Sequence, residues 1–418
     1  MNIFKKTIFT GFSPNLTLRD TLLAVSFLVL PWKWFFIRRG NNVSVVEREI
    51  EKYFNIKHCY TFDSGRSALY FILKALGVKS GDEVLVQAYT CMVVVNAIKW
   101  TGATPVYLDV NDDFNLSVAD LEKKISARSK ALLVQHTFGL ACPMDQVMQI
   151  AKNNNIFVVE DCAHAFGAKY NGQFVGTFGD AAILSFGADK VISSVRGGAV
   201  ITDNEEISKA LKSYQDNLPL PRIGKTIQHL MHYPIFLKGR LFYSLYLGKL
   251  ILGLAKKINL INKIIYKEEK MGEQVSFYPA KYAHSLARIL LNQLKDADRI
   301  NQHRKKIAEY YDGNLKNAKI VSPWLNKIKK EDCIYLRYPL LAEQARALRA
   351  YGKINGVILG DWYNSVIAPI DIDFSKTDYN AGSCPKAEQL AERSVNLPTD
   401  RHIDLKAAKR IVDLLNKF

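Results

Sequence analysis

Six short apolar runs, separated by amphipathic stretches, constrain the fold of this chain more than any other feature. Helical patterns cover residues 93–100 and 144–155 between two pairs of runs, and residues 43–54 and 68–76 before the first. Apolar strands that alternate with helices form mainly parallel sheets covered on both faces. We therefore expect an α/β fold with a large domain over 43–215, whose strands are residues 83–89, 104–110, 130–136, 156–162, 181–186 and 197–203.

An apolar and basic N-terminal extension, residues 1–42, precedes this pattern. Its apolar run 22–37 contains Pro31 and Lys33, and no small-residue cleavage site follows it. The run has about 16 residues, whereas a helix needs roughly 20 to cross a bilayer. We therefore expect neither a signal peptide nor a spanning helix. The aromatic and basic residues near its end are typical of an anchor at a membrane surface.

A second apolar and basic segment is an insertion over residues 216–275. Its stretch 229–272 holds eight Lys or Arg and only two Glu, among many Leu, Ile, Tyr and Phe residues. Anionic headgroups would attract such lysines at about 1 kcal/mol each near a membrane surface. The alternative is that extension and insertion pack on each other or across a dimer. Residues 276–418 have the pattern of a smaller C-terminal α/β domain, with a long helix over 285–311 and a closing helix over 405–417.

The formal net charge of +17 suggests a polyanionic neighbour: nucleic acid, an anionic membrane surface or a phosphate-rich substrate. No nucleic-acid-binding module is recognisable, and the basic excess accompanies apolar aromatic residues, so we do not expect nucleic acid. The six cysteines include no CxxC pair, so we expect neither a metal site nor a disulfide framework. This cysteine usage favours a reducing cytoplasm.

The expected strand-to-helix turn over residues 63–67, Asp-Ser-Gly-Arg-Ser, combines a glycine with small hydroxyl residues. A helix N-terminus of this composition offers free backbone N–H groups and the positive end of the helix dipole, which suits a phosphate. The same residues also serve as ordinary helix caps. Taken alone, the turn leaves both interpretations open.

Asp161 and Lys190 are the two charged residues most easily connected to catalysis. Asp161 ends an apolar strand, so its carboxylate points into the crevice where open α/β sheets bind ligands, although a helix cap is the alternative role. Lys190 follows the run 181–186 and could form a Schiff base with an aldehyde cofactor, although most lysines are solvated surface residues. Residues 196–198, Arg-Gly-Gly, allow a tight turn beside Lys190.

Together these motifs occur in an order that resembles the DegT/DnrJ/EryC1/StrS family of sugar aminotransferases, over roughly residues 43–415. This resemblance implies a fold-type I enzyme with a mainly parallel seven-stranded sheet, a smaller C-terminal α/β domain and a homodimeric assembly. The matching stretches are residues 64–91, 102–110, 135–145, 158–172, 176–190, 196–203 and 384–398.

The resemblance also assigns roles to individual residues. It implies that Lys190 carries pyridoxal 5'-phosphate as a Schiff base and that Asp161 pairs with the pyridine nitrogen. His164 takes a position near the ring's phenolic oxygen. Cys91 falls where many members have a stacking aromatic ring, so we expect Tyr89 to take over that contact. Phosphate contacts are expected from Gly65, Arg66, Ser67 and Ser185.

By the same resemblance, Lys190 indicates the reaction class, because the members that dehydrate sugars have His at this position. We expect transfer of an amino group, from glutamate, to a keto-sugar destined for surface polysaccharide or lipopolysaccharide. The alternatives are a sugar dehydratase, or a regulatory or scaffold protein built on the same fold. His136 and Lys281 are further expected substrate contacts.

One departure from the family pattern concerns residues 279–282, Pro-Ala-Lys-Tyr, where members have a stretch resembling Asn-Tyr-Arg-Met that reaches a neighbour's cofactor phosphate and substrate. Lys281 can replace the arginine, but the asparagine is missing. Together with the apolar, basic segments, this suggests a cytoplasmic enzyme attached peripherally to the inner face of the membrane. The keto-sugar is then either nucleotide-linked or joined to a polyprenyl phosphate.

Overall fold

The computed structural model describes residues 7–11, 13–322 and 332–418. A seven-stranded sheet forms its centre, in the strand order β2-β11-β10-β7-β6-β3-β5. β11 pairs antiparallel with β10 and with β2, and every other neighbouring pair is parallel. The strands are β2 (His58–Phe62), β3 (Glu83–Gln87), β5 (Thr104–Leu108), β6 (Ser129–Gln135), β7 (Phe157–Asp161), β10 (Ala181–Ser185) and β11 (Gly198–Thr202). All six predicted runs form strands, and the expected α/β fold is confirmed; β2, at one edge, was not predicted.

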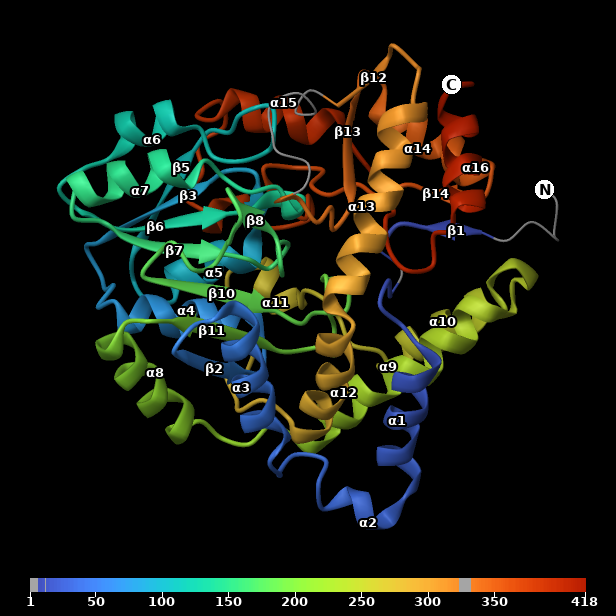
Figure 1. The fold of residues 1–418 in the computed structure, drawn as a ribbon, viewed down its shortest axis with the longest axis horizontal. Helices are drawn as coiled ribbons and strands as arrows, with labels where there is room; N and C mark the ends of the chain where they lie inside the picture. The colour runs from blue at the N-terminus through green and yellow to red at the C-terminus, as the bar shows by residue number, and fades with distance from the viewer. Residues whose placement is uncertain (1–6, 12, 323–331) are drawn as a thin grey trace.

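Helices cover both faces of this sheet (Figure 1) because its side chains alternate between apolar cores on its two faces. Leu133 and Val159 are buried in the core that also contains α4 and α5. Their neighbours Leu132 and Val158 are buried with α6 and α7 on the opposite face. The helices of this part are α3 (Asn42–Phe54), α4 (Gly65–Ala75), α5 (Met92–Lys99), α6 (Val118–Lys124), α7 (Met144–Asn153) and α8 (Glu205–Asn217).

The C-terminal part contains an antiparallel three-stranded sheet in the order β12-β13-β16. The long helix expected over 285–311 is two helices, α12 (His284–Lys295) and α13 (Ala297–Asn314), which meet at Asp296. The remaining elements are β12 (Ile320–Val321), β13 (Tyr338–Ala342), α14 (Ala345–Ile354), β14 (Val357–Ile358), β15 (Ile367–Ala368), α15 (Pro385–Arg393), β16 (Ser394–Leu397) and α16 (Leu405–Leu415).

Short strand pairs connect distant parts of the chain. β1 (Ile8–Phe9), in the N-terminal extension, pairs in parallel with β14. β4 (Thr90–Cys91) pairs in parallel with β15, which fixes the loop after β3 against the C-terminal part. The other short elements are β8 (Lys169–Tyr170) with β9 (Gln173–Phe174), and the 3-10 turns at Thr137–Gly139, Tyr243–Leu245 and Phe374–Lys376.

The extension and the insertion pack against each other. The extension forms α1 (Leu18–Val29) and α2 (Pro31–Trp34), and the insertion forms a hairpin of α9 (Ile223–Leu241) and α10 (Leu247–Lys257), followed by α11 (Lys267–Lys270). α1 lies against α9 and α12. In Figure 1, α2 lies at the lower margin and the α9–α10 hairpin projects to the right, away from the central sheet. Among the described residues, no helix combines the length and the apolarity needed to cross a membrane.

Candidate active site

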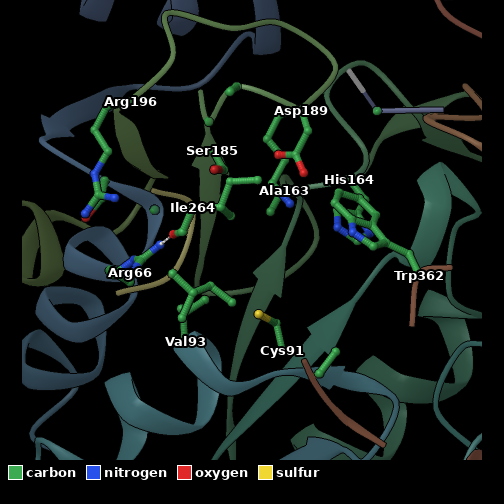
Figure 2. Close-up of a pocket in the computed structure, with 18 of the residues that line it drawn as sticks. Arg66, Cys91, Val93, Ala163, His164, Ser185, Asp189, Arg196, Ile264 and Trp362 are labelled. Carbon is green, nitrogen blue, oxygen red and sulfur yellow. Dashed lines mark hydrogen bonds between the residues drawn. The ribbon is translucent and has the colours of Figure 1, made fainter. Parts of the chain in front are cut away.

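A cavity of about 350 Å³ opens where β7 and β10 end and α4 begins. Its walls come from distant segments: the extension at Gly11 and Ser13, the loop from β10 to β11, the insertion, and the loop before β15. Figure 2 shows Arg66 and Arg196 on one side of the cavity and His164 beside Trp362 on the other. The cavity lies at the carboxyl ends of parallel strands, where open α/β sheets bind their ligands.

Lys190 lines this cavity from the loop that joins β10 to β11. Its backbone N–H donates to the carbonyl of Gly187 at 3.2 Å, and its own carbonyl accepts from the Asn15 side chain. Its Nζ lies 4.9 Å from the ring centroid of Trp362. The backbone of Lys190 is therefore fixed at both its N–H and its carbonyl, and its amine lies over Trp362 in the cavity.

Asp161, the last residue of β7, is a buried carboxylate in the same cavity. Burial raises its pKa, whereas a hydrogen bond from the Ala163 N–H to its Oδ1 at 2.9 Å and the charge of Lys190 act in the opposite direction. A buried carboxylate gains most from a cationic partner that also donates a hydrogen bond. The protonated nitrogen of a pyridinium ring fits this requirement.

The opposite end of the cavity has the features of a phosphate site. Ser64 caps α4 by accepting from the Ser67 N–H, and the first N–H groups of any helix lack acceptors within it. A Cβ added to Gly65 would lie 3.2 Å from Ser185 Oγ, so this glycine keeps the serine hydroxyl accessible. Arg196 is 5% exposed and its Nη2 is buried without a hydrogen-bond partner among the described residues. These groups fit a phosphate.

Arg66 faces the same end, but its side chain is already engaged. Its guanidinium forms an ion pair with the fully buried Glu269 and donates to the carbonyl of Ile264 at 2.8 Å. Burial and the nearby charge of Arg196 lower its pKa to about 10. The insertion therefore holds Arg66 in place, whereas Nη2 of Arg196 has no hydrogen-bond partner in the part of the chain that the structure describes.

His164 and Trp362 form the wall opposite the arginines. The two rings stack with centroids 5.0 Å apart and an interplanar angle of 11°. His164 Nδ1 accepts from the Phe138 N–H at 3.5 Å, which leaves Nε2 to donate to Tyr363 Oη at 3.4 Å. Burial lowers the pKa of His164 well below its usual range, so the ring is neutral near pH 7.

The sequence profile of the DegT/DnrJ/EryC1/StrS aminotransferase family matches residues 28–226 and 254–416. The chain belongs to this family. Residues 1–27 and 227–253, which include much of α1, α9 and α10, lie outside the match.

Several relatives are named as enzymes that make amino sugars. GDP-perosamine synthase of Escherichia coli O157:H7 is 39% identical over 197 residues, which cover 47% of this chain and 53% of that protein, so this match spans about half of its length. The dTDP-3-amino-3,6-dideoxy-alpha-D-galactopyranose transaminase of Aneurinibacillus thermoaerophilus is 27% identical over 395 residues, 93% of each chain.

Solved structures of the family share the fold. Helicobacter pylori PseC, an aminotransferase involved in the biosynthesis of pseudoaminic acid, has a TM-score of 0.75 at 20% identity and covers 99% of each chain. The PLP-form of Spr1654 from Streptococcus pneumoniae, described as a sugar aminotransferase, has a TM-score of 0.73 at 21% identity over 99% of this chain and 98% of that chain. The fold-type I architecture expected from the sequence is confirmed.

Most of the residues singled out by the family resemblance line the cavity. Seven of the eleven do so: Gly65, Arg66, Cys91, Asp161, His164, Ser185 and Lys190. Ser67 is buried one turn into α4, where its hydroxyl donates to Asp63 Oδ1 at 2.7 Å, so it stabilises the turn from behind the cavity.

Tyr89, His136 and Lys281 are not brought to the cavity. Tyr89 is fully buried and accepts from the Tyr363 N–H at 2.6 Å, so it supports the loop that carries Trp362. His136 is fully buried, and its Nε2 lies 3.0 Å from Oε2 of the fully buried Glu160. Lys281 lines a smaller neighbouring cavity.

The sequence analysis missed Trp362, Ser13 and His232 as lining residues, and treated Arg196 only as part of a turn. Ser13 Oγ and His232 Nε2 are hydrogen-bonded at 3.0 Å. Both belong to the segments that the family profile does not match. Trp362 and Arg196 reach the cavity from loops, and the spacing of apolar residues does not predict where loop side chains lie.

Proposed function

We propose that this chain is a pyridoxal-phosphate-dependent aminotransferase that aminates a keto-sugar. The observation that carries the proposal is that Lys190, Asp161 and an anion site around Ser185 and Arg196 face one cavity. A strand-end acid and a helix N-terminus that line the same cavity suit a flat heterocycle with a phosphate arm. The names of the relatives support the sugar class.

Each residue has a distinct role in this proposal. When bound, pyridoxal phosphate supplies an aldehyde that takes and releases amino groups and a ring that accepts the electrons of the broken C–H bond. Asp161 would keep the ring nitrogen protonated, and His164, being neutral, would lie near the ring without adding a charge beside it. Lys190 Nζ would hold the aldehyde of the cofactor and would accept and return the proton at the substrate carbon.

For the substrates, we propose glutamate as the amino donor and a keto-sugar used for surface glycan as the acceptor, in a homodimer. Family resemblance supports all three. Size-exclusion chromatography with light scattering tests the dimer, and incubation with glutamate tests the donor, because 2-oxoglutarate must appear in amounts equal to the enzyme before any acceptor is added.

The decisive experiment is reduction of the loaded protein with borohydride, followed by mass spectrometry of its peptides. We expect the cofactor mass on the peptide that contains Lys190, and no turnover in Lys190→Ala. A matched control is Lys209→Ala, an exposed lysine on α8, which should leave turnover unchanged. Undiminished conversion in Lys190→Ala would contradict the proposal, and product without consumption of glutamate would indicate a dehydratase.

We also propose peripheral attachment to an anionic membrane. Trp32, Trp34, Phe35 and Phe36 are all exposed at and after α2, Phe35 to 83%. On α10 and directly after it, the exposed residues Leu247, Leu250, Leu254 and Ile258 recur at the spacing of one helix face. A helix that turns three leucines to the solvent departs from the usual globular pattern.

Flotation with vesicles tests the attachment. We expect the protein to float with phosphatidylcholine vesicles that contain phosphatidylglycerol, less at high salt, and less as Leu250→Ser/Leu254→Ser. Ile354→Ser, an exposed apolar residue on α14, is the control. Protein that stays with the soluble fraction whatever the anionic lipid content contradicts the attachment.

A further inference from the structure

The two segments outside the family match do more than cover the surface, because both reach into the cavity. Gly11 and Ser13 come from the extension, and His232 and Phe236 come from α9. Phe236 stacks on His232 with ring centroids 3.9 Å apart, and His232 is hydrogen-bonded to Ser13. One wall of the cavity in this chain therefore comes from segments that the family profile does not match.

The lip of the cavity on this side is apolar and open to solvent. Ile264 lines the cavity and is nevertheless 57% exposed, and Ile265 and Phe236 also line it. Asn262 lines the cavity as well, but its Oδ1 already accepts from Tyr266 Oη at 2.9 Å. The three apolar side chains suit a hydrocarbon chain better than the polar base and ribose of a nucleotide.

The exposed apolar turn of the hairpin lies a short way along α9 from this lip. Phe236 and Leu241 are five residues apart on α9, about 7.5 Å along the helix axis and on different faces of it. Leu241, Phe242 and Leu245 are exposed at the end of that helix and in the turn that follows. A long chain that leaves the cavity over Phe236 and crosses α9 therefore reaches an exposed apolar surface.

Cations lie beside the same lip. Lys225 and Arg196 line one small cavity beside the main one. Burial, followed by the charges of Arg196 and Lys263, lowers the pKa of Lys225, and the charge of Glu268 acts in the opposite direction. Lys263 directly precedes Ile264 in the chain and is exposed. A phosphate or diphosphate near Lys225 and Lys263 would be attracted by both ammonium groups.

We propose that the acceptor is a lipid-linked keto-sugar, joined through a phosphate or diphosphate to a long hydrocarbon chain that leaves the cavity over Ile264 and Phe236. This inference rests on the proposed aminotransferase function and names its substrate class. The sugar lies at Lys190, the phosphate lies near Lys225 and Lys263, and the hydrocarbon follows the α9–α10 hairpin into the membrane.

Calorimetric titration of the cofactor-loaded enzyme with geranylgeranyl diphosphate, UDP, GDP and dTDP tests the carrier. We expect the isoprenoid diphosphate to bind at least about tenfold more tightly than each nucleotide. Ile264→Ser and Phe236→Ser should each weaken its binding by about tenfold, because each loses buried apolar surface. Ile354→Ser, exposed on α14, is the control for non-specific adhesion.

The lipid carrier is overturned if any of the three nucleotides binds more tightly than the isoprenoid diphosphate. It is also overturned if Ile264→Ser binds the isoprenoid diphosphate as tightly as Ile354→Ser does. The visible absorbance of the bound cofactor, measured in the same samples, separates this result from failure of the proposed function. Protein that takes up pyridoxal phosphate and consumes glutamate, yet prefers a nucleotide, remains an aminotransferase with a different acceptor. Protein that takes up no cofactor contradicts the proposed function itself.

Discussion

Replacing Arg196 with alanine should weaken the binding of pyridoxal 5'-phosphate while leaving the binding of pyridoxal, which lacks the phosphate, almost unchanged. Arg196 is 5% exposed, and its Nη2 has no hydrogen-bond partner among the described residues. Arg66 cannot substitute for it, because Glu269 and the Ile264 carbonyl already bind the Arg66 guanidinium. The phosphate therefore depends on Arg196 for its charged hydrogen bond.

The size of the effect follows from this geometry. A hydrogen bond to a charged group contributes about 1.5–3 kcal/mol, and each 1.4 kcal/mol corresponds to a factor of about ten in the dissociation constant. We expect the dissociation constant for pyridoxal phosphate to rise about 10- to 150-fold. Arg196→Lys keeps the charge but loses the fork of donors. Its dissociation constant should lie between those of the unchanged protein and Arg196→Ala.

The assay is a spectroscopic titration of the cofactor-free protein with each of the two aldehydes, and the ratio of their dissociation constants isolates the phosphate contact. Arg222→Ala is the matched control, because Arg222 is exposed and donates to the Ser276 carbonyl. Burial raises the pKa of Asp63 and the charge of Arg196 lowers it, so removing Arg196 also affects the stability of the fold. A thermal melt therefore accompanies each titration. Equal losses for both aldehydes, or an unchanged ratio, would refute the phosphate role of Arg196.

Three further perturbations test other parts of the site. Asp161→Asn keeps the shape but removes the charge, and we expect turnover to fall about 10²- to 10³-fold in steady-state assays, with a smaller change in cofactor binding. Gly198→Ala places a Cβ 2.6 Å from Gly65 Cα, and overpacking of this kind should cost about 1–3 kcal/mol in urea unfolding. Burial lowers the pKa values of His229 and His232 to about 3, whereas unfolded histidine takes up a proton near pH 6.5. The unfolded state therefore binds more protons below that pH, and each histidine should remove about 2 kcal/mol of stability between pH 7 and pH 5. His232→Gln should lose less of its free energy of unfolding between pH 7 and pH 5 than the unchanged protein does. An equal loss in the variant would contradict the burial of a neutral His232.

Sequence patterns predicted the centre of the molecule because its elements are local and strongly periodic. The six apolar runs became strands, and since parallel strands end at one edge of the sheet, Asp161 and Ser185 were brought to the same crevice. The place of Lys190 in the cavity followed from its position in the loop after β10. β2 was missed because His58, Tyr60 and Thr61 interrupt its apolar residues, although it pairs with β11 at the edge of the sheet.

The rest of the site depends on contacts between residues far apart in the sequence. Trp362 reaches His164 only because β15 pairs with β4 and Tyr89 holds the Tyr363 backbone. Arg66 has the expected position in the turn, but Glu269, some 200 residues later, determines where its side chain points. No pattern within a short window of sequence contains this information.

The insertion cannot be regarded as a membrane anchor added to a finished active site. A simple anchor could be exchanged without consequence for the cavity, whereas here Glu269 and the Ile264 carbonyl fix Arg66, and His232 is bound to Ser13 of the extension. Because Arg66 is thereby engaged, the phosphate end depends on Arg196, whose Nη2 has no hydrogen-bond partner among the described residues. Changes in the insertion should therefore alter cofactor binding as well as membrane contact, and the two properties are coupled through the Arg66–Glu269 pair.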